Sequence, residues 1–304
     1  MRRVLLIAGP TASGKSAAAL ELACAFGAVI VNADSMQVYS DLRILTARPT
    51  SDEEAKAPHR LFGEIDGAVN YSVGSWLRRA RGIMGEIGEK PVVFVGGTGL
   101  YFRALTEGLS DMPAIPGPVR ERIRAEAEGR ASADLHAELA ALDPSTAARL
   151  RPSDRQRTLR ALEVYAATGR PLVAFQAARA VPALRPGEWT GLFLEPDRGA
   201  LYSRIDARFD AMLDRGALDE TAALIGRGLD PALPVMRALG VRQLVAHFEG
   251  RLSLAEAAES AKAETRRYAK RQFTWGRHQL LGFKWVGPEE ALDEGKKALR
   301  KSFA

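Results

Sequence analysis

The stretch Gly9-Pro10-Thr11-Ala12-Ser13-Gly14-Lys15-Ser16 matches the pattern G-x-x-x-x-G-K-[ST] at every fixed position. The apolar run at 4–8 before it predicts a buried β-strand, and the Ala- and Leu-rich run at 17–26 after it predicts a helix. Backbone N–H groups converge where a glycine-rich turn enters a helix, so we expect these eight residues to bind a phosphate or pyrophosphate. Lys15 would reach the outer phosphate, and the Ser16 hydroxyl would ligate Mg²⁺. The loop does not by itself indicate ATP.

Composition excludes several classes of protein. The chain has 304 residues, of which 46% are hydrophobic and 26% charged, as in a globular protein with about two domains. Its apolar runs are too short to cross a membrane, and the single cysteine, Cys24, excludes an internal disulfide. We therefore expect a cytoplasmic protein with no membrane partner.

The net charge of +6 is concentrated in two segments. Residues 149–160 contain five arginines and one acid, and residues 262–277 contain six basic residues and one acid. Either segment alone could be a solvated helix face. Both together, in a chain with a phosphate loop, favour a nucleic-acid partner.

Polar residues follow two further predicted strands. The strand at 28–32 is followed by Asp34, and the strand at 91–95 by Gly96, Gly97 and Thr98. Because ligands of parallel sheets bind outside the carboxyl ends of the strands, we expect Asp34 and Thr98 near the phosphate loop. Asp34 is also a candidate helix cap or outer ligand of Mg²⁺. The glycines would let a ligand approach the backbone, and they stand where a purine-nucleotide hydrolase would carry an aspartate.

The remaining pattern divides the chain in two. Residues 119–179 are helical throughout, which predicts an all-helical insertion at 111–189 in a core formed by 1–110 and 190–304. The core is predicted to be α/β, with a P-loop NTPase-like parallel sheet flanked by helices.

Several elements of the core are predicted less distinctly. We expect a polar loop at 41–58, a strand at 191–194 and one helix at 236–248. A long basic helix at 254–275 is predicted to end the core.

A further predicted helix, at 197–213, carries Arg204 and Arg208 four residues apart on one face. Such a pair can clamp an anionic group such as a phosphate or pyrophosphate. The alternative is pairing with Asp206 or Asp210 on the same helix.

Six stretches of the chain, taken in order, match a known pattern. They are Gly-Pro-Thr-Ala-Ser-Gly-Lys-Ser (9–16), Ala-Asp-Ser-Met-Gln-Val-Tyr (33–39), Gly-Gly-Thr-Gly-Leu-Tyr (96–101), Asp-Arg-Gln-Arg-Thr-Leu-Arg-Ala-Leu-Glu-Val-Tyr (154–165), Arg-Ile-Asp-Ala-Arg-Phe-Asp-Ala-Met-Leu (204–213) and Thr-Arg-Arg-Tyr-Ala-Lys-Arg-Gln-Phe-Thr-Trp (265–275). Together they resemble the bacterial tRNA dimethylallyltransferases, also called isopentenyl-pyrophosphate tRNA transferases. The first stretch is generic, whereas the second and the last are specific.

The resemblance implies transfer of a dimethylallyl group from dimethylallyl pyrophosphate to N6 of the adenosine 3′ of the anticodon, in tRNAs reading codons that begin with U. It implies that Asp34 binds and deprotonates this amine, that Lys15 and Arg208 neutralise the leaving pyrophosphate, and that Thr98 contacts the substrates. The residues implied in tRNA binding are Asp34, Ser35, Met36, Gln37, Thr98, Arg120, Gln156, Arg157, Thr158, Leu159 and Arg160. The insertion would bind the anticodon stem-loop, Mg²⁺ would be the cofactor near Ser16, and the protein would act as a monomer.

Three positions depart from the family pattern. Leu45 stands where the family usually has glycine, Val241 where it usually has tyrosine, and Gly276 where it often has an aromatic residue. None of them is an implied catalytic residue.

Two other functions remain open. In a P-loop small-molecule or nucleoside kinase, Glu195 would bind the metal, but the arginine-rich insertion and the missing strand-end aspartate oppose this reading. A non-catalytic RNA-binding module is opposed by the intact Lys15, Ser16 and Asp34.

Overall fold

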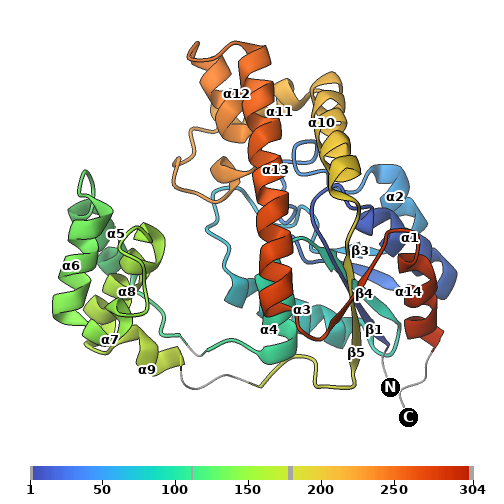
Figure 1. Cartoon of the computed structure of the whole chain (residues 1–304), viewed down its shortest axis with the longest axis horizontal. Coiled ribbons are helices and arrows are strands. Elements are labelled where there is room, and N and C mark those ends of the chain that lie inside the picture. Colours follow the sequence, from blue (N-terminus) through green and yellow to red (C-terminus); the bar gives the residue numbers. More distant parts are fainter. Residues whose placement is uncertain (1–2, 111, 177–180, 301–304) are drawn as a thin grey trace. The chain divides into compact units, whose positions relative to one another are not determined.

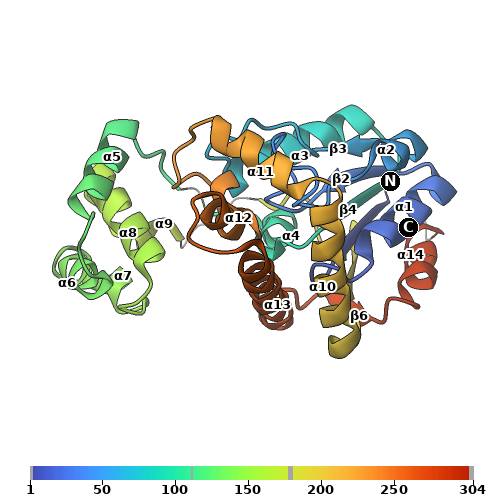
Figure 2. The same ribbon diagram turned by 90° about the horizontal axis from the view of Figure 1, so that it is seen from above.

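The computed structural model describes residues 3–110, 112–176 and 181–300. They form two compact units, a helical one at Glu107–Pro182 and an α/β core from the rest of the described chain. The core holds one parallel sheet in the order β3-β2-β4-β1-β5-β6, whose strands are labelled in Figures 1 and 2. The strands are β1 (Val4–Ala8), β2 (Val29–Asn32), β3 (His59–Arg60), β4 (Val92–Gly96), β5 (Trp189–Leu194) and β6 (Phe283–Val286). The predicted α/β class, a parallel sheet with flanking helices, is confirmed.

One face of the sheet is covered by two helices from opposite ends of the chain. Leu5 and Ile7 of β1 join a buried cluster with α1 (Lys15–Phe26) and α14 (Ala291–Arg300), which lie side by side (Figure 1). Leu6, between them, is also fully buried but points to the opposite face, as the two-residue period of a strand requires. Burial on both faces is the reason that the strands are continuous apolar runs.

The opposite face of the sheet is covered by two other helices, which contact it through aromatic side chains. Trp76 of α3 (Val73–Ile87) packs edge-on against Phe94 of β4, with ring centroids 6.2 Å apart. Phe273 of α13 (Leu254–Gln279) contacts Phe193 of β5, with centroids 6.0 Å apart.

The remaining helices of the core are α2 (Ser51–Lys56), α4 (Gly99–Glu107), α10 (Arg198–Asp214), α11 (Ala217–Gly226) and α12 (Val241–Phe248), with one 3₁₀ turn, η1 (Val235–Arg237). Helices α10 and α13 pack together through the buried Leu201, Ile205 and Ala269 (Figure 2). Among the described residues, no helix combines the length and apolar composition needed to cross a bilayer.

The helical unit has a core of its own. Its helices are α5 (Gly117–Glu126), α6 (Ser132–Leu142), α7 (Pro144–Ala147), α8 (Arg155–Thr168) and α9 (Leu172–Gln176). Leu135, Leu139 and Leu162 are buried in it. Asp143 is buried as well, and its carboxylate accepts the N–H groups of Thr146 and Leu172 at 2.9 and 3.1 Å. That side chain therefore connects the start of α7 to the start of α9.

The structure places the limits of the helical unit earlier than the sequence predicts. The predicted limits were 111 and 189, whereas the unit spans Glu107–Pro182. The segment after it belongs to the core, because the Leu184 N–H donates to the Leu105 carbonyl at 2.9 Å and β5 already begins at Trp189. Position 111 itself lies outside the described residues.

Three predictions for the core are wrong in detail. The polar loop at 41–58 contains α2, which begins with a capping box between Thr50 and Glu53. The single helix predicted at 236–248 is η1 and α12, separated at Gly240 with φ of +89°. Helix α13 does not end the core, since β6 and α14 follow it.

The strand order brings the predicted functional segments together. Strands β2, β4, β1 and β5 are neighbours, and all run parallel. The segments after their carboxyl ends therefore share one edge of the sheet, which is where ligands of such sheets bind. These segments carry Asp34, Thr98, the phosphate loop and Glu195.

Candidate active site

The phosphate loop connects β1 to α1 with an unusual backbone. Gly14 and Ala12 have φ of +89° and +61°, a left-handed conformation that non-glycine residues rarely adopt. Helix α1 has no side-chain cap at its N-terminus, so its first N–H groups are available to an anion. The Ser13 hydroxyl is buried and has no hydrogen-bond partner among the described residues. An uncapped helix start beside an unsatisfied hydroxyl is the arrangement expected of an anion site.

Two cations lie at this loop. The Lys15 ammonium donates to the Pro10 carbonyl at 3.0 Å, and Arg208 of α10 donates to the Thr11 hydroxyl. Burial lowers the pKa of Lys15 to about 8, while the Asp34 carboxylate acts to raise it and Arg208 to lower it. Burial likewise lowers the pKa of Arg208 to about 10, again opposed by Asp34. Burial thus destabilises the charged forms of Lys15 and Arg208. An incoming anion would offset this effect, because it would stabilise both charged forms.

Asp34 is held by its neighbours after β2. The buried Asn32 side chain accepts the Asp34 N–H at 2.8 Å and donates to the Asp34 carbonyl at 2.9 Å. Asp34 Oδ1 accepts the Met36 N–H at 2.9 Å, which leaves Oδ2 for a substrate. The sequence reasoning missed Asn32, although a polar residue ending an apolar strand is a signal for such a role.

Thr98 is held near Asp34 by hydrogen bonds to Ser35, the residue that follows Asp34 in the chain. Thr98 Oγ1 accepts the Ser35 N–H at 2.9 Å and donates to the Ser35 hydroxyl at 3.2 Å. Tyr268 of α13 belongs to the same group of residues. Burial raises the pKa of its phenol, and the charge of Asp34 raises this pKa further, to a smaller extent. The Tyr268 hydroxyl therefore stays protonated and can donate a hydrogen bond.

The glycines after β4 accommodate the protein itself. A Cβ at Gly96 would lie 2.1 Å from the Ala33 carbonyl, and one at Gly99 would lie 2.1 Å from the Trp275 ring. A Cβ at Gly97 would meet the Gln272 amide at 2.2 Å. Gly96 is therefore small because the backbone of Ala33 packs against it, whereas Gly97 also lines a cavity, so that approach of a ligand to Gly97 stays a prediction.

Gln272 joins the two loops that border the site. Its Oε1 accepts the Thr11 N–H at 2.9 Å, and its Nε2 donates to the Gly97 carbonyl at 2.9 Å. This side chain was not singled out from the sequence, although it belongs to the specific stretch 265–275.

Two cavities adjoin these residues. The larger, of about 280 Å³, is lined by Thr11, Asp34 and Arg208, together with apolar side chains of α10 and of the segment after β2. The smaller, of about 230 Å³, is lined mainly by apolar groups of α4, β5 and α13. Tyr268 and Arg271 line both cavities. The larger cavity therefore combines an anion site with a carboxylate.

Ser16 is the only protein ligand that the sequence predicts for Mg²⁺. Its side chain is exposed on the first turn of α1, beside the phosphate loop. The described residues contain no group of three His, Cys, Asp or Glu side chains that could hold a metal ion. The donor set therefore suits an ion that takes most of its ligands from phosphate oxygens and water, as Mg²⁺ does.

Arg204 and Glu195 make no described contact with the phosphate loop. Arg204 is exposed, and no described contact joins it to the phosphate loop, in contrast to Arg208. The acids of the same helix, Asp206 and Asp210, pair with Arg266 and Lys262 of α13 instead. Glu195 Oε1 lies 2.7 Å from Arg277, so it is committed to an ion pair rather than to the metal of a kinase.

The predicted RNA-contacting residues of the helical unit differ in exposure. Gln156 and Arg157 are exposed at the start of α8, while Arg120, Leu159 and Arg160 are half-buried. Leu159 packs on the core of the unit. Thr158 is fully buried, and its hydroxyl donates to the Asp154 carbonyl at 2.9 Å. A contact between the Thr158 side chain and RNA does not fit this position, because the hydroxyl is turned into the helix.

The three departures from the family pattern are all in close packing. Leu45 is buried, and a Cβ at Gly240 would lie 3.2 Å from it. Val241, the next residue, is fully buried. A Cβ at Gly276 would lie 2.5 Å from the Phe193 ring, so an aromatic side chain would not fit there without a shift.

Comparison with known proteins identifies the family of the chain. A family model described as IPP transferase matches residues 37–279, and one described as isopentenyl transferase matches residues 2–69. The chain belongs to the IPP transferase family. The tRNA dimethylallyltransferase of Methylocella silvestris is 61% identical over 290 residues, covering 94% of this chain and 95% of that protein. The tRNA dimethylallyltransferase of Beijerinckia indica is 59% identical over 290 residues, covering 94% and 96%.

Solved structures of IPP transferases share the fold. The tRNA isopentenylpyrophosphate transferase of Staphylococcus epidermidis is 30% identical, with a TM-score of 0.67 over 98% of both chains. A eukaryotic dimethylallyltransferase acting on tRNA is 25% identical, with a TM-score of 0.82 over 98% of this chain and 78% of that one. The family that the six stretches resemble is thus confirmed, and the kinase alternative is not favoured.

Proposed function

We propose that this chain is a tRNA dimethylallyltransferase. It transfers the dimethylallyl group of dimethylallyl pyrophosphate to N6 of the adenosine 3′ of the anticodon, in tRNAs that read codons beginning with U. The observation that carries the proposal is the larger cavity, where Arg208 and the phosphate loop meet Asp34. In this reaction a weakly nucleophilic amine attacks a carbon that loses an anionic leaving group, so a carboxylate and cations are needed in one place.

In this reaction one bond forms and one breaks. The adenine N6 attacks the first carbon of the dimethylallyl group, and the carbon–oxygen bond to pyrophosphate breaks with its electron pair going to the pyrophosphate. One N6 proton passes to Asp34, whose Oδ2 is not engaged by the Met36 N–H. A positioned carboxylate contributes to such a step because an adenine amine is a poor nucleophile.

Negative charge develops on the leaving oxygen as the bond breaks. Lys15 and Arg208 are the cations beside the loop, and the N-terminus of α1 adds its N–H groups. Preorganised positive groups stabilise this charge more than solvent would, because the protein need not reorganise during the reaction. Mg²⁺, held by Ser16 and pyrophosphate oxygens, would supply further charge neutralisation when bound.

The tRNA is proposed to bind through its anticodon stem-loop to the helical unit and to the segment around Asp34. The target base must leave its stack to reach a cavity at a sheet edge. Arg157, which is exposed on α8, would contact phosphates. We propose that the protein works as a monomer in the cytoplasm, where its tRNA substrates are found.

The test is a transfer assay with two possible donors. Purified protein is incubated with Mg²⁺, undermodified tRNA and either carbon-labelled dimethylallyl pyrophosphate or γ-labelled ATP. We expect label from dimethylallyl pyrophosphate in the RNA at the adenosine 3′ of the anticodon, with release of pyrophosphate. Label from ATP in RNA or in a small molecule, without prenyl transfer, would refute the proposal.

A further inference from the structure

The segment after Asp34 forms a wall of the larger cavity without belonging to any helix or strand. Leu45 and Thr46 line the cavity, next to Met36 and Asp34. The Gln37 amide donates to the carbonyls of Thr46 and Ala47, at 2.9 Å each. The wall, which we define as residues 43–47, is thereby joined to residues proposed to contact tRNA.

Glu220 of α11 binds the backbone of this wall. Glu220 Oε1 accepts the Ile44 N–H at 2.8 Å and also the Arg43 N–H. Its Oε2 accepts the Leu45 N–H at 2.8 Å. Three consecutive N–H groups thus converge on one carboxylate, as successive backbone N–H groups do in concavities that bind anions. Such bonds to a charged acceptor are about twice as strong as neutral ones.

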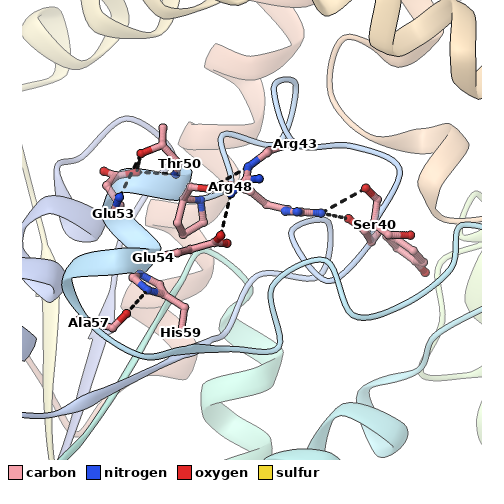
Figure 3. Close-up of polar contacts among 10 residues, drawn as sticks. Ser40, Arg43, Arg48, Thr50, Glu53, Glu54, Ala57 and His59 are labelled. Carbon is pink, nitrogen blue, oxygen red and sulfur yellow. Dashed lines mark hydrogen bonds and ion pairs between the residues drawn. The ribbon is translucent and has the colours of Figure 1, made fainter.

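The ends of the wall are held by other contacts. Arg48 donates to the Tyr39 and Ser40 carbonyls at 2.9 and 3.2 Å, and Arg43 pairs with Glu54 of α2 at 2.9 Å (Figure 3). These contacts lie within residues 39–54, whereas Glu220 reaches the wall from α11. In the described chain, Glu220 is the side chain that satisfies the N–H groups of residues 43–45.

We propose that Glu220 is a positioning residue, which sets the wall of the cavity against which the tRNA nucleotide is placed. This rests on the proposed function. Glu220 touches neither the phosphate loop nor Asp34 in the described contacts, so it acts through Leu45 and Thr46. Its loss should weaken productive tRNA binding and leave the pyrophosphate side unchanged.

Glutamine is the sharpest substitution, because it keeps the size and removes the charge. In Glu220→Gln, one amide oxygen remains as acceptor, and the amide –NH₂ faces backbone N–H groups. Each lost charged hydrogen bond corresponds to about tenfold or more in an equilibrium. We expect the KM for tRNA to rise about tenfold or more, with kcat within about threefold and the KM for dimethylallyl pyrophosphate within about twofold of wild type.

The chain offers a matched control on the same helix. Asp219 precedes Glu220 in α11 and is exposed, so Asp219→Asn removes an equal charge and should leave all three constants unchanged. Glu220→Asp keeps the charge with a shorter side chain and should give a tRNA KM between wild type and Glu220→Gln. It also serves as the test variant if Glu220→Gln does not fold.

The outcome is decided by which constant moves. An unchanged tRNA KM in Glu220→Gln, or an equal rise for both substrates, would overturn the positioning role. A filter-binding measurement with the same tRNA separates this inference from the proposed function. If wild type binds tRNA without transferring the prenyl group, the proposed function fails. The ratio of the Kd values of Glu220→Gln and wild type then tests Glu220 alone.

Discussion

The substitution Asp34→Asn separates the proton acceptor from everything else that Asp34 does. Asparagine has the same shape, and its carbonyl oxygen can still accept the Met36 N–H that Oδ1 accepts now. The two hydrogen bonds between the Asn32 side chain and residue 34 involve the backbone N–H and carbonyl of residue 34, so they are retained. The site should therefore keep its geometry while losing one negative charge and one base.

Two effects of different size follow. A general base contributes about 10²- to 10⁴-fold, so single-turnover transfer should slow by that factor. The second effect acts through Lys15, whose pKa of about 8 includes an upward contribution from the Asp34 charge. Without that charge the pKa of Lys15 falls below this value, so more of the lysine is neutral in mildly alkaline solution. Pyrophosphate affinity should then weaken near pH 8 and change little near pH 6.5.

The assay measures both effects on one protein. Single-turnover transfer with labelled dimethylallyl pyrophosphate gives the rate, and a non-reactive pyrophosphate analogue gives the affinity, each at pH 6.5 and pH 8 and across Mg²⁺ concentrations. Glu21→Gln is the matched control, since Glu21 is an exposed acid on the helix that follows the phosphate loop.

Two results would refute this reasoning. Full transfer activity in Asp34→Asn would remove Asp34 from the mechanism as a base. A loss of analogue affinity at both pH values that excess Mg²⁺ restores would make Asp34 a metal ligand instead.

Three further predictions follow from the same contacts. In wild type, pyrophosphate affinity should fall as pH rises through about 8, because burial lowers the pKa of Lys15 to about 8 and an anion binds the protonated lysine. Lys15→Ala should lose at least about tenfold in pyrophosphate affinity and should also lose this pH dependence. A changed Kd for tRNA in a filter assay would contradict the assignment of Lys15 to the pyrophosphate. Arg157→Ala should flatten the salt dependence of tRNA binding, reducing the magnitude of the slope of log K against log salt by about 0.7–0.9. The double variant of Arg157→Ala with Arg160→Ala should reduce that magnitude further. An unchanged slope with weaker binding would indicate base contacts or a structural role. Gln272→Leu removes a side chain that joins the phosphate loop to the segment after β4, so the KM for dimethylallyl pyrophosphate should rise at least about tenfold, and a KM equal to that of wild type would show that the loops hold their positions without it.

The sequence by itself determined the features that depend on local chemistry. The glycines, Lys15 and Ser16 specify a turn that enters a helix, and apolar runs of four or five residues specify buried strands. Asp154 caps α8 by accepting the Arg157 N–H, a contact between residues three apart in the sequence. Such features are readable because backbone preference and hydrophobic period act within a few residues.

Short elements and exact limits were less readable for the same reason. Strand β3 has two residues, too few for any period, and it is held by pairing with β2. The capping box at Thr50 was present in the sequence and marks α2, but the helix has six residues and no apolar face to reveal it. The break at Gly240 depends on a left-handed backbone that the surrounding helical pattern conceals.

Only the tertiary structure decided which distant groups meet. Gln272 contacts Thr11 across 261 residues, Arg208 contacts Thr11 across 197, and Glu220 contacts Ile44 across 176. The strand order and the packing of α10, α11 and α13 set these contacts, and no local pattern encodes them. The glycines after β4 illustrate the difference, since their small size was evident from the sequence but the groups they accommodate are Ala33, Gln272 and Trp275. A residue type states what can approach it, and the fold alone determines what does.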